Sequence, residues 1–159
     1  MAFTPFAKIT IPRKEFAFGI VVERGLEKYF IFVGQKPIED IPKFADVASV
    51  FVGCLTKSDL LEATIPAKVI SYIAMGKPII LAMDGEVQNL INSTIMCGFA
   101  GPSGDARALA ENIARAYRLS PFERIKMGDR ARIYHQNYLS RSVLLGELNN
   151  TLKSSARIQ

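Results

Sequence analysis

The sequence has few of the residues that metal sites and reactive centres commonly use. It holds two cysteines and one histidine in 159 residues, too few for a structural zinc site, which takes four such ligands. Cys54 and Cys97 lie in apolar stretches and form no CxxC pair, so we interpret both as reduced core residues of a cytoplasmic protein. His135 lies on a segment predicted to be a surface helix, and we assign it no role.

Long apolar runs and the common nucleotide fingerprints are also missing. No stretch of about 18 uncharged apolar residues is present, which argues against a transmembrane helix. The start, MAFTPFAKITIPRKE, lacks the apolar centre of a signal peptide. Neither GxGxxG, GxxxxGK[ST] nor GxSxG occurs, which excludes the usual phosphate loops and a nucleophile elbow. We expect a cytoplasmic protein, either free or at the inner face of the membrane.

The charge is positive, with a formal net value of +5, which suits anionic partners. From residue 121 onward, the sequence holds seven Lys or Arg residues and three acidic residues. Because these charges follow helical spacing, a solvated helix face is the first interpretation and contact with a membrane surface the second. Nucleic acid is not an expected partner, since no basic stripe with interleaved aromatic residues appears.

Short apolar runs alternate with helical segments, and 49% of the residues are hydrophobic. This pattern predicts an α/β fold with a Rossmann-like, doubly wound parallel sheet in a single domain, closed by C-terminal helices. Residues 154–159 are expected to be a flexible tail. The predicted strands are residues 8–11, 29–33, 49–53, 78–82 and 97–100. The predicted helices are residues 13–24, 41–48, 66–75, 86–91 and 105–119, a helix that follows the capping box Ser120–Glu123, and a last helix that follows Ser140.

The stretch TIPAKVISYIAMGKPII, residues 64–80, is the main candidate site. Its helix follows a long loop after a buried strand, and ligands of such sheets bind outside the carboxyl ends of the strands. Thr64 is the expected cap, and the backbone N–H groups around Pro66 to Lys68 would form an anion site. Ala67, Lys68 and Ser71 share one face of this helix.

Two interpretations of that face remain open. Lys68 either binds a phosphate or is a solvated surface lysine, and Ser71 either binds a ligand hydroxyl or is a neutral helix residue. The opposite face, formed by Pro66, Val69, Ile70 and Ile73, is expected to pack on the sheet.

Glu86 in the tetrapeptide MDGE follows the next buried strand. It lies at the same predicted crevice, and we expect it either near a bound ligand or as an acid that stabilises a helix N-terminus.

Four stretches together resemble the GT-B glycosyltransferases of family-4 type, the bacterial group 1 sugar transferases. IPAKVISYIAMGKPIILAMDGE is similar to their P-S-K-L-x-E-Y-x-A-x-G-K-P-V-I … G-E motif. YFIFVGQKPIEDIPKFADVASVFV, CGFAGPSGDARALAENI and MGDRARIYHQNYLSR resemble further blocks of that family in the same order. The resemblance covers roughly residues 7–150 and is carried by the order of the blocks.

The resemblance implies the C-terminal, donor-binding domain of such an enzyme, here residues 1–153 in truncated form. Its substrate would be a nucleotide-diphosphate sugar, used in polysaccharide or lipid-linked oligosaccharide synthesis without a metal ion or other cofactor. The diphosphate would lie at the start of the helix 66–75, with Thr64, Ile65 and Pro66 along it, and Glu86 near the donor sugar. Helix N-terminus and basic side chains would stabilise the departing diphosphate.

The sequence departs from the family pattern at several points. Ser71 stands where the family has a ribose-binding glutamate, Ala67 where it has a serine, and residues 11–13 carry no glycine-rich loop. The first strand of the domain and the acceptor domain are missing from the pattern. We therefore expect little transfer by the chain alone, and an acceptor-domain protein or a second copy as partner.

Two other functions compete with the donor-binding one. The first is a non-catalytic interaction protein that keeps the scaffold, which the departures at Ala67 and Ser71 favour. The second is one half of a nucleotide-sugar epimerase, for which Glu62, Asp84 and Glu86 are the only candidate acid–base carboxylates.

Overall fold

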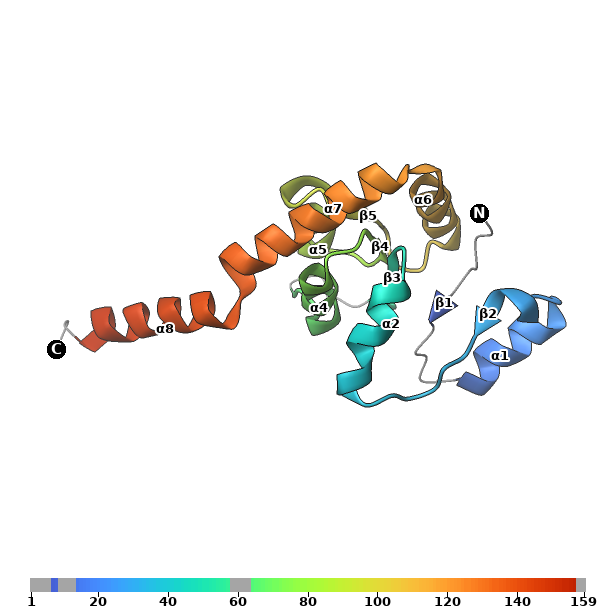
Figure 1. The fold of residues 1–159 in the computed structure, drawn as a ribbon, viewed down its shortest axis with the longest axis horizontal. Coiled ribbons are helices and arrows are strands. Elements are labelled where there is room, and N and C mark those ends of the chain that lie inside the picture. Colours follow the sequence, from blue (N-terminus) through green and yellow to red (C-terminus); the bar gives the residue numbers. More distant parts are fainter. Residues whose placement is uncertain (1–6, 9–13, 58–63, 157–159) are drawn as a thin grey trace. The chain divides into compact units, whose positions relative to one another are not determined.

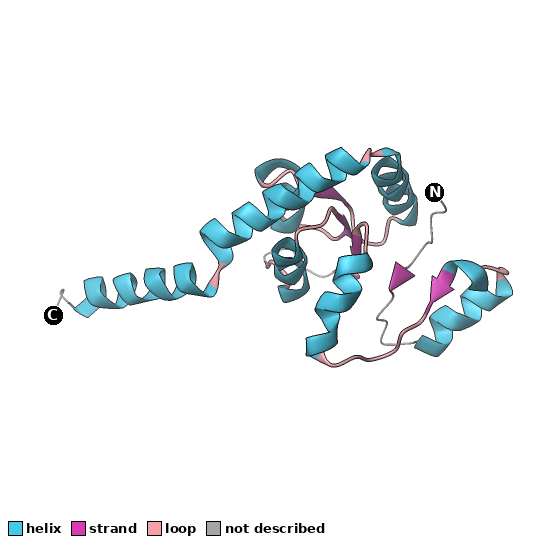
Figure 2. Ribbon diagram, viewed as in Figure 1, coloured by secondary structure: helices cyan, strands magenta, loops and turns pink. Residues whose placement is uncertain are grey.

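The computed structural model describes residues 7–8, 14–57 and 64–156 (Figure 1). The chain divides into two compact units, residues 1–48 and 49–159, and each is described by itself. Helices and parallel strands alternate in both (Figure 2), which confirms the α/β fold with a parallel sheet. No helix within the described ranges is both long and apolar enough to cross a bilayer.

The first unit is small and built around one parallel strand pair. β1 (Ala7–Lys8) pairs with β2 (Phe30–Ile31), with Ala7 opposite Phe30. Phe32 packs edge-on against Phe18 at 5.6 Å and stacks on Phe30 at 6.3 Å, ring centre to ring centre. The remaining elements are α1 (Lys14–Glu23), η1 (Glu27–Tyr29), η2 (Ile38–Asp40) and α2 (Ile41–Val47).

The second unit holds a three-stranded parallel sheet in the order β3-β4-β5. Its strands are β3 (Phe51–Cys54), β4 (Ile79–Ala82) and β5 (Gly98–Gly101). All four residues of the central strand β4 are buried, as the continuous apolar run predicted. The strands lie where the sequence placed them, within one or two residues.

Helices cover both faces of this sheet. Ile79 and Leu81 of β4 belong to the main core with Val69 and Ile73 of α4 (Ala67–Met75). Ile80 and Ala82 point to the opposite face, where α6 (Ala106–Arg118) packs on β4 and β5. The other helices among the described residues of the unit are α5 (Glu86–Asn89), η3 (Leu90–Thr94), α7 (Pro121–Tyr134), η4 (His135–Leu139) and α8 (Arg141–Ala156).

Two helices, α6 and α7, begin at their predicted capping signals. Asp105 caps α6 by accepting a hydrogen bond from the Ala108 N–H, and Ser120 with Glu123 forms the expected capping box of α7. α8 continues to Ala156, three residues into the segment expected to be a tail. Two π-helical turns, η3 and η4, were not anticipated.

The two cysteines differ in their exposure to solvent. Cys97 is fully buried, and burial raises the pKa of its thiol to about 12. Cys54 is exposed, so its prediction as a core residue was wrong. It is the last residue of β3, which pairs with one strand, β4, among the described residues, and so has fewer groups to cover it.

Candidate functional site

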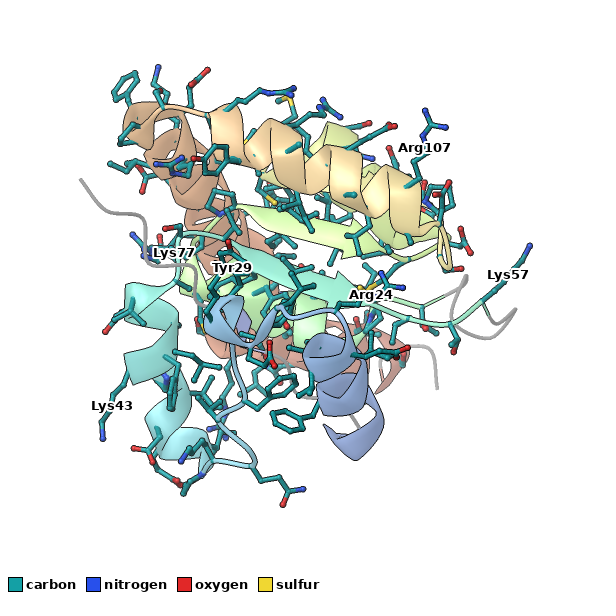
Figure 3. The ribbon with its side chains drawn as sticks, turned by 90° about the vertical axis from the view of Figure 1, so that its right-hand side faces the viewer. Arg24, Tyr29, Lys43, Lys57, Lys77 and Arg107 are labelled. Carbon is teal, nitrogen blue, oxygen red and sulfur yellow. The ribbon has the colours of Figure 1, made fainter. Side chains whose placement is uncertain are left out.

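The carboxyl ends of the three strands in the second unit lie side by side. The Leu55 N–H donates to the Ala82 carbonyl, and the Met83 N–H donates to the Gly101 carbonyl, both at 3.0 Å. Figure 3 shows Lys57 and Arg107 beyond the arrowheads of these strands. The loops that lead into α4, α5 and α6 therefore leave from one edge of the sheet, where parallel α/β folds bind ligands.

α4 begins at this edge with an uncapped N-terminus. Pro66 is the N-cap residue, no side chain of the described residues caps the helix, and its first turn holds no acid. The prediction of Thr64 as the cap was wrong, because the helix starts two residues later than a Thr64 cap requires. The N–H groups of Ala67 and Lys68 precede the first intrahelical bond, from Val69 to the Pro66 carbonyl, the position at which helix N-termini bind anions.

Tyr72 fixes α4 on the sheet. Its ring stacks on Phe51 of β3 with centres 4.8 Å apart, and its hydroxyl donates to the Val52 carbonyl at 3.5 Å. Val69 and Ile73 are fully buried beneath the helix, as predicted, whereas Pro66 and Ile70 are only partly buried. These contacts hold α4 against β3.

The predicted ligand-facing side chains of α4 are all exposed: Ala67, Lys68 and Ser71. The Lys68 charge is close enough to Cys54 to oppose the rise in the thiol pKa that burial causes. The Ser71 hydroxyl donates to the Ala67 carbonyl at 3.2 Å, a bond to its own helical turn. Thr64 and Ile65 are also exposed and lead into this helix.

Glu86 occupies the first position of α5, and its side chain is exposed. Gly85 before it adopts φ 87°, a conformation that glycine tolerates best. The structure therefore places Glu86 after the β4 end and the segment from Thr64 to Ser71 after the β3 end, at the same edge of the sheet. The roles of these residues stay predictions.

A polar junction between two loops was not anticipated. Asp84 follows β4 and Ser103 follows β5. The Ser103 N–H donates to Asp84 Oδ1 at 3.2 Å, and the Ser103 hydroxyl donates to Asp84 Oδ2. Gln88 Nε2 donates to the Met83 carbonyl at 2.9 Å. Each of the two residues follows a strand of the sheet, but no local sequence pattern indicates that their side chains meet.

The charge of Asp84 is stabilised by this junction. The hydrogen bonds from Ser103 lower the pKa of the Asp84 carboxyl, and the positive charge of Lys57 lowers it further. A carboxylate stabilised in this way is a poor general base. Of the other candidate acid–base carboxylates, Glu62 lies outside the described residues and Glu86 is exposed.

Comparison with known proteins identifies the family to which this chain is similar. The family model described as "Glycosyl transferases group 1" matches residues 13–118. This range contains the first unit from residue 13 onward, the sheet of the second unit and all of the candidate site.

Two curated relatives are bacterial. The chain is 31% identical over 96 residues to the amylovoran biosynthesis glycosyltransferase AmsK of Erwinia amylovora, covering 60% of this chain and 23% of that protein. It is 26% identical over 136 residues to the putative colanic acid biosynthesis glycosyltransferase WcaL of Escherichia coli K12, covering 85% of this chain and 33% of that protein. The chain thus spans a third or less of the length of these two relatives.

A solved structure has the same fold. The chain superimposes on the crystal structure of Anabaena Alr3699/HepE in complex with UDP with a TM-score of 0.75. The match covers 94% of this chain and 40% of that one, at 16% sequence identity.

Proposed function

Because the chain belongs to the group 1 glycosyl transferases, we propose that it binds the nucleoside-diphosphate part of a nucleotide sugar. The site is the edge of the sheet at the carboxyl ends of β3, β4 and β5. The observation that carries this proposal is the start of α4, a helix N-terminus at the strand-end edge of the sheet that holds no acid and that no side chain of the described residues caps. Such a helix end attracts a diphosphate through its N–H groups and its dipole.

Lys68 supplies the mobile charge of this site. It lies in the first turn of α4 with an exposed side chain, so its ammonium group can follow a phosphate as negative charge grows on it. The departing diphosphate would be stabilised by Lys68 and the N–H groups of Ala67 and Lys68, which act where charge develops. We propose that no metal ion takes part, so chelation of divalent cations leaves nucleotide affinity unchanged.

The reaction class would be transfer of a sugar during polysaccharide or lipid-linked oligosaccharide synthesis. The relatives AmsK and WcaL are named for the synthesis of such polymers, and the structural neighbour was solved with UDP. The acceptor would be bound by protein outside this chain, either an acceptor-domain protein or a second copy, in the cytoplasm or at the inner face of the membrane. By itself the chain would transfer little sugar.

Titration calorimetry with UDP, GDP and ADP tests this proposal. We expect at least one of these nucleotides to bind, weakly, with an affinity that EDTA does not change. Absence of heat with all three would contradict nucleotide binding. Transfer from a UDP- or GDP-sugar at ordinary enzyme rates by the chain alone would contradict the need for another acceptor-binding part.

One observation favours the alternative of a non-catalytic interaction protein. The Ser71 hydroxyl donates to the carbonyl of Ala67, and a serine offers no paired carboxylate oxygens to ribose hydroxyls. Sedimentation separates the two functions. A stable complex with an acceptor-domain protein supports the enzyme, whereas a monomer that binds no nucleotide supports the interaction protein.

A further inference from the structure

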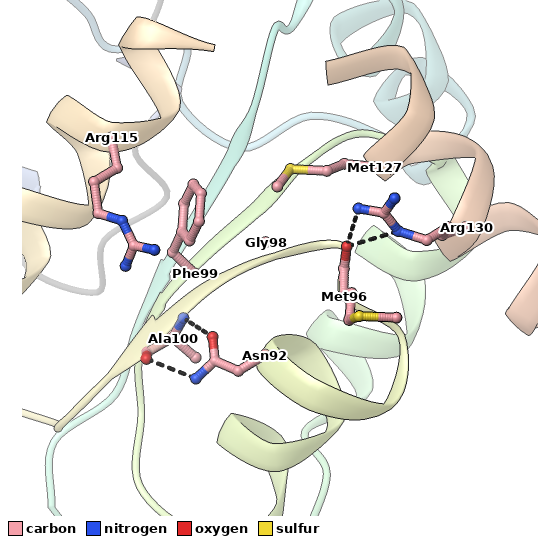
Figure 4. A pocket seen from close by; sticks show the side chains of 8 residues that line it. All are labelled: Asn92, Met96, Gly98, Phe99, Ala100, Arg115, Met127 and Arg130. Carbon is pink, nitrogen blue, oxygen red and sulfur yellow. Dashed lines mark hydrogen bonds between the residues drawn. The ribbon is translucent and has the colours of Figure 1, made fainter. Parts of the chain in front are cut away.

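A depression lies on the second unit away from the candidate nucleotide site. Its volume is about 380 Å³, within the range of small-ligand sites. Figure 4 shows it around the first residues of β5, with Arg115 of α6 on one side and Arg130 of α7 on the other. It is lined by Asn92, Met96, Gly98, Phe99, Ala100, Arg115, Met127 and Arg130.

The guanidinium of Arg115 is held in place by two neutral groups. It lies over the Phe99 ring, 4.1 Å from the ring centre, and Nη1 donates to Asn112 Oδ1 at 3.2 Å. Asn112 is itself buried, with 8% of its surface exposed. A fixed guanidinium loses little freedom when it binds an anion, which favours affinity.

Arg130 is held in a similar way on the opposite side. Its Nε donates to the Met96 carbonyl at 2.8 Å, and Nη2 donates to the same oxygen. Met96 adopts φ 55°, a conformation uncommon for a residue with a side chain. The same residue, Met96, thus combines an uncommon backbone conformation with a carbonyl that accepts hydrogen bonds from two N–H groups of Arg130.

Neither guanidinium charge is neutralised by a carboxylate in the described part of the chain. The ion pairs found there are Lys43–Asp40, Arg107–Glu111 and Arg132–Asp129, and the lining of the depression contains no acid. Two fixed positive charges in one concave site, both held by neutral groups, attract an anion.

We propose that this depression binds a phosphate ester. Guanidinium groups match the geometry of phosphate oxygens and can donate two parallel hydrogen bonds to them. The ring of Phe99 and the thioethers of Met96 and Met127 provide apolar contacts for the organic part of the ester. The depression lies toward the start of β5, whereas the nucleotide site lies beyond the strand ends, so the two sites are separate.

Nuclear magnetic resonance with glycerol phosphate as the probe, and glycerol as the neutral control, tests the site. We expect the amide signals of Gly98, Phe99 and Ala100 to shift with glycerol phosphate and not with glycerol. The variant Arg115→Gln should weaken this binding about tenfold or more, as expected for loss of charge-assisted hydrogen bonds. Arg107→Gln is the matched control, since it removes an exposed cation from the same helix outside the depression.

A second variant keeps the charge of the site. Arg130→Lys should weaken glycerol phosphate binding, because an ammonium cannot keep two N–H groups on the Met96 carbonyl and still present a fork to the phosphate. The loss should be smaller than in Arg115→Gln, because the lysine keeps the positive charge. No shift at Gly98 to Ala100, or equal shifts in wild type and Arg115→Gln, would overturn the proposal. Neither result bears on the nucleotide site, which Lys68→Ala tests separately.

The ester could be a soluble molecule or a lipid headgroup, and vesicles distinguish these sources. Each protein is sedimented with phosphatidylglycerol vesicles. If the vesicles pull down the wild type but not Arg115→Gln, the site binds a lipid headgroup. Phosphatidylcholine vesicles serve as the control without net charge. If vesicle binding is absent, or survives Arg115→Gln, glycerol phosphate binding assigns the site to a soluble ester.

Discussion

Gly128 of α7 lies directly against the carbonyl of Gly76, the residue that ends α4. A Cβ built at Gly128 would lie 2.2 Å from the Gly76 oxygen, far inside van der Waals contact. Gly76 itself adopts φ 65°, the left-handed conformation of a helix C-terminus. The absence of side chains at these two glycines lets the end of α4 pack closely against α7. This packing positions α4, whose start forms the candidate site.

Gly128→Ala should therefore destabilise the second unit strongly. The added methyl group must displace backbone, which costs about 1–3 kcal/mol or more. Urea unfolding measures the change. The matched control is Gly146→Ala in α8, where nothing lies within 4 Å of the added Cβ and the gain in helix propensity should stabilise or leave stability unchanged. Equal effects of the two variants would contradict the close approach.

Asp84 should make stability depend on pH in the acid range. Its pKa is lowered in the folded protein, mainly by hydrogen bonds from Ser103. A lowered folded-state pKa contributes stability that is present above the unfolded value, near pH 4, and is lost as pH falls through the folded value. The melting temperature of the wild type should exceed that of Asp84→Asn at pH 6, and the difference should shrink below pH 4. A difference that stays constant from pH 6 to pH 3 would contradict this linkage.

Asn92 protects the outer edge of the sheet. Its Nδ2 donates to the Ala100 carbonyl at 3.0 Å, and its Oδ1 accepts from the Ala100 N–H at 2.8 Å, so a side chain takes the place of a neighbouring strand on β5. Asn92→Ala should cost about 1–2 kcal/mol and increase aggregation through the uncovered edge. Light scattering and urea unfolding measure the two effects. The exposed neighbour Ser93→Ala is the control, and an Asn92→Ala protein as stable and soluble as that control would refute this role.

Ser71→Glu should strengthen UDP binding. At this position of α4 a carboxylate can accept hydrogen bonds from both ribose hydroxyls, whereas the Ser71 hydroxyl donates to Ala67. We expect an affinity gain of about tenfold, measured by calorimetry, and a smaller gain with 2′,3′-dideoxy UDP. An equal gain with both nucleotides would place residue 71 away from the ribose.

The parallel strands and the α4 start could be predicted because local sequence determines them. Apolar runs marked β3 and β4, and Gly76-Lys77-Pro78 marked the end of α4. The Asp84–Ser103 junction, the Asn92–Ala100 pair and the Gly128–Gly76 contact join residues 8 to 52 positions apart, so no local pattern reveals them. The cap of α4 was mispredicted because threonine is a preferred N-cap residue, whereas the backbone enters the helix only after Pro66.

The most direct test of the proposed donor site is UDP affinity in Lys68→Ala, measured by calorimetry beside Lys153→Ala. Lys153 is an exposed lysine of α8, outside the candidate site, and so controls for the loss of one positive charge. The proposal predicts about tenfold weaker UDP binding in Lys68→Ala and no change in Lys153→Ala. Equal UDP affinity in both variants would contradict a diphosphate bound at the start of α4.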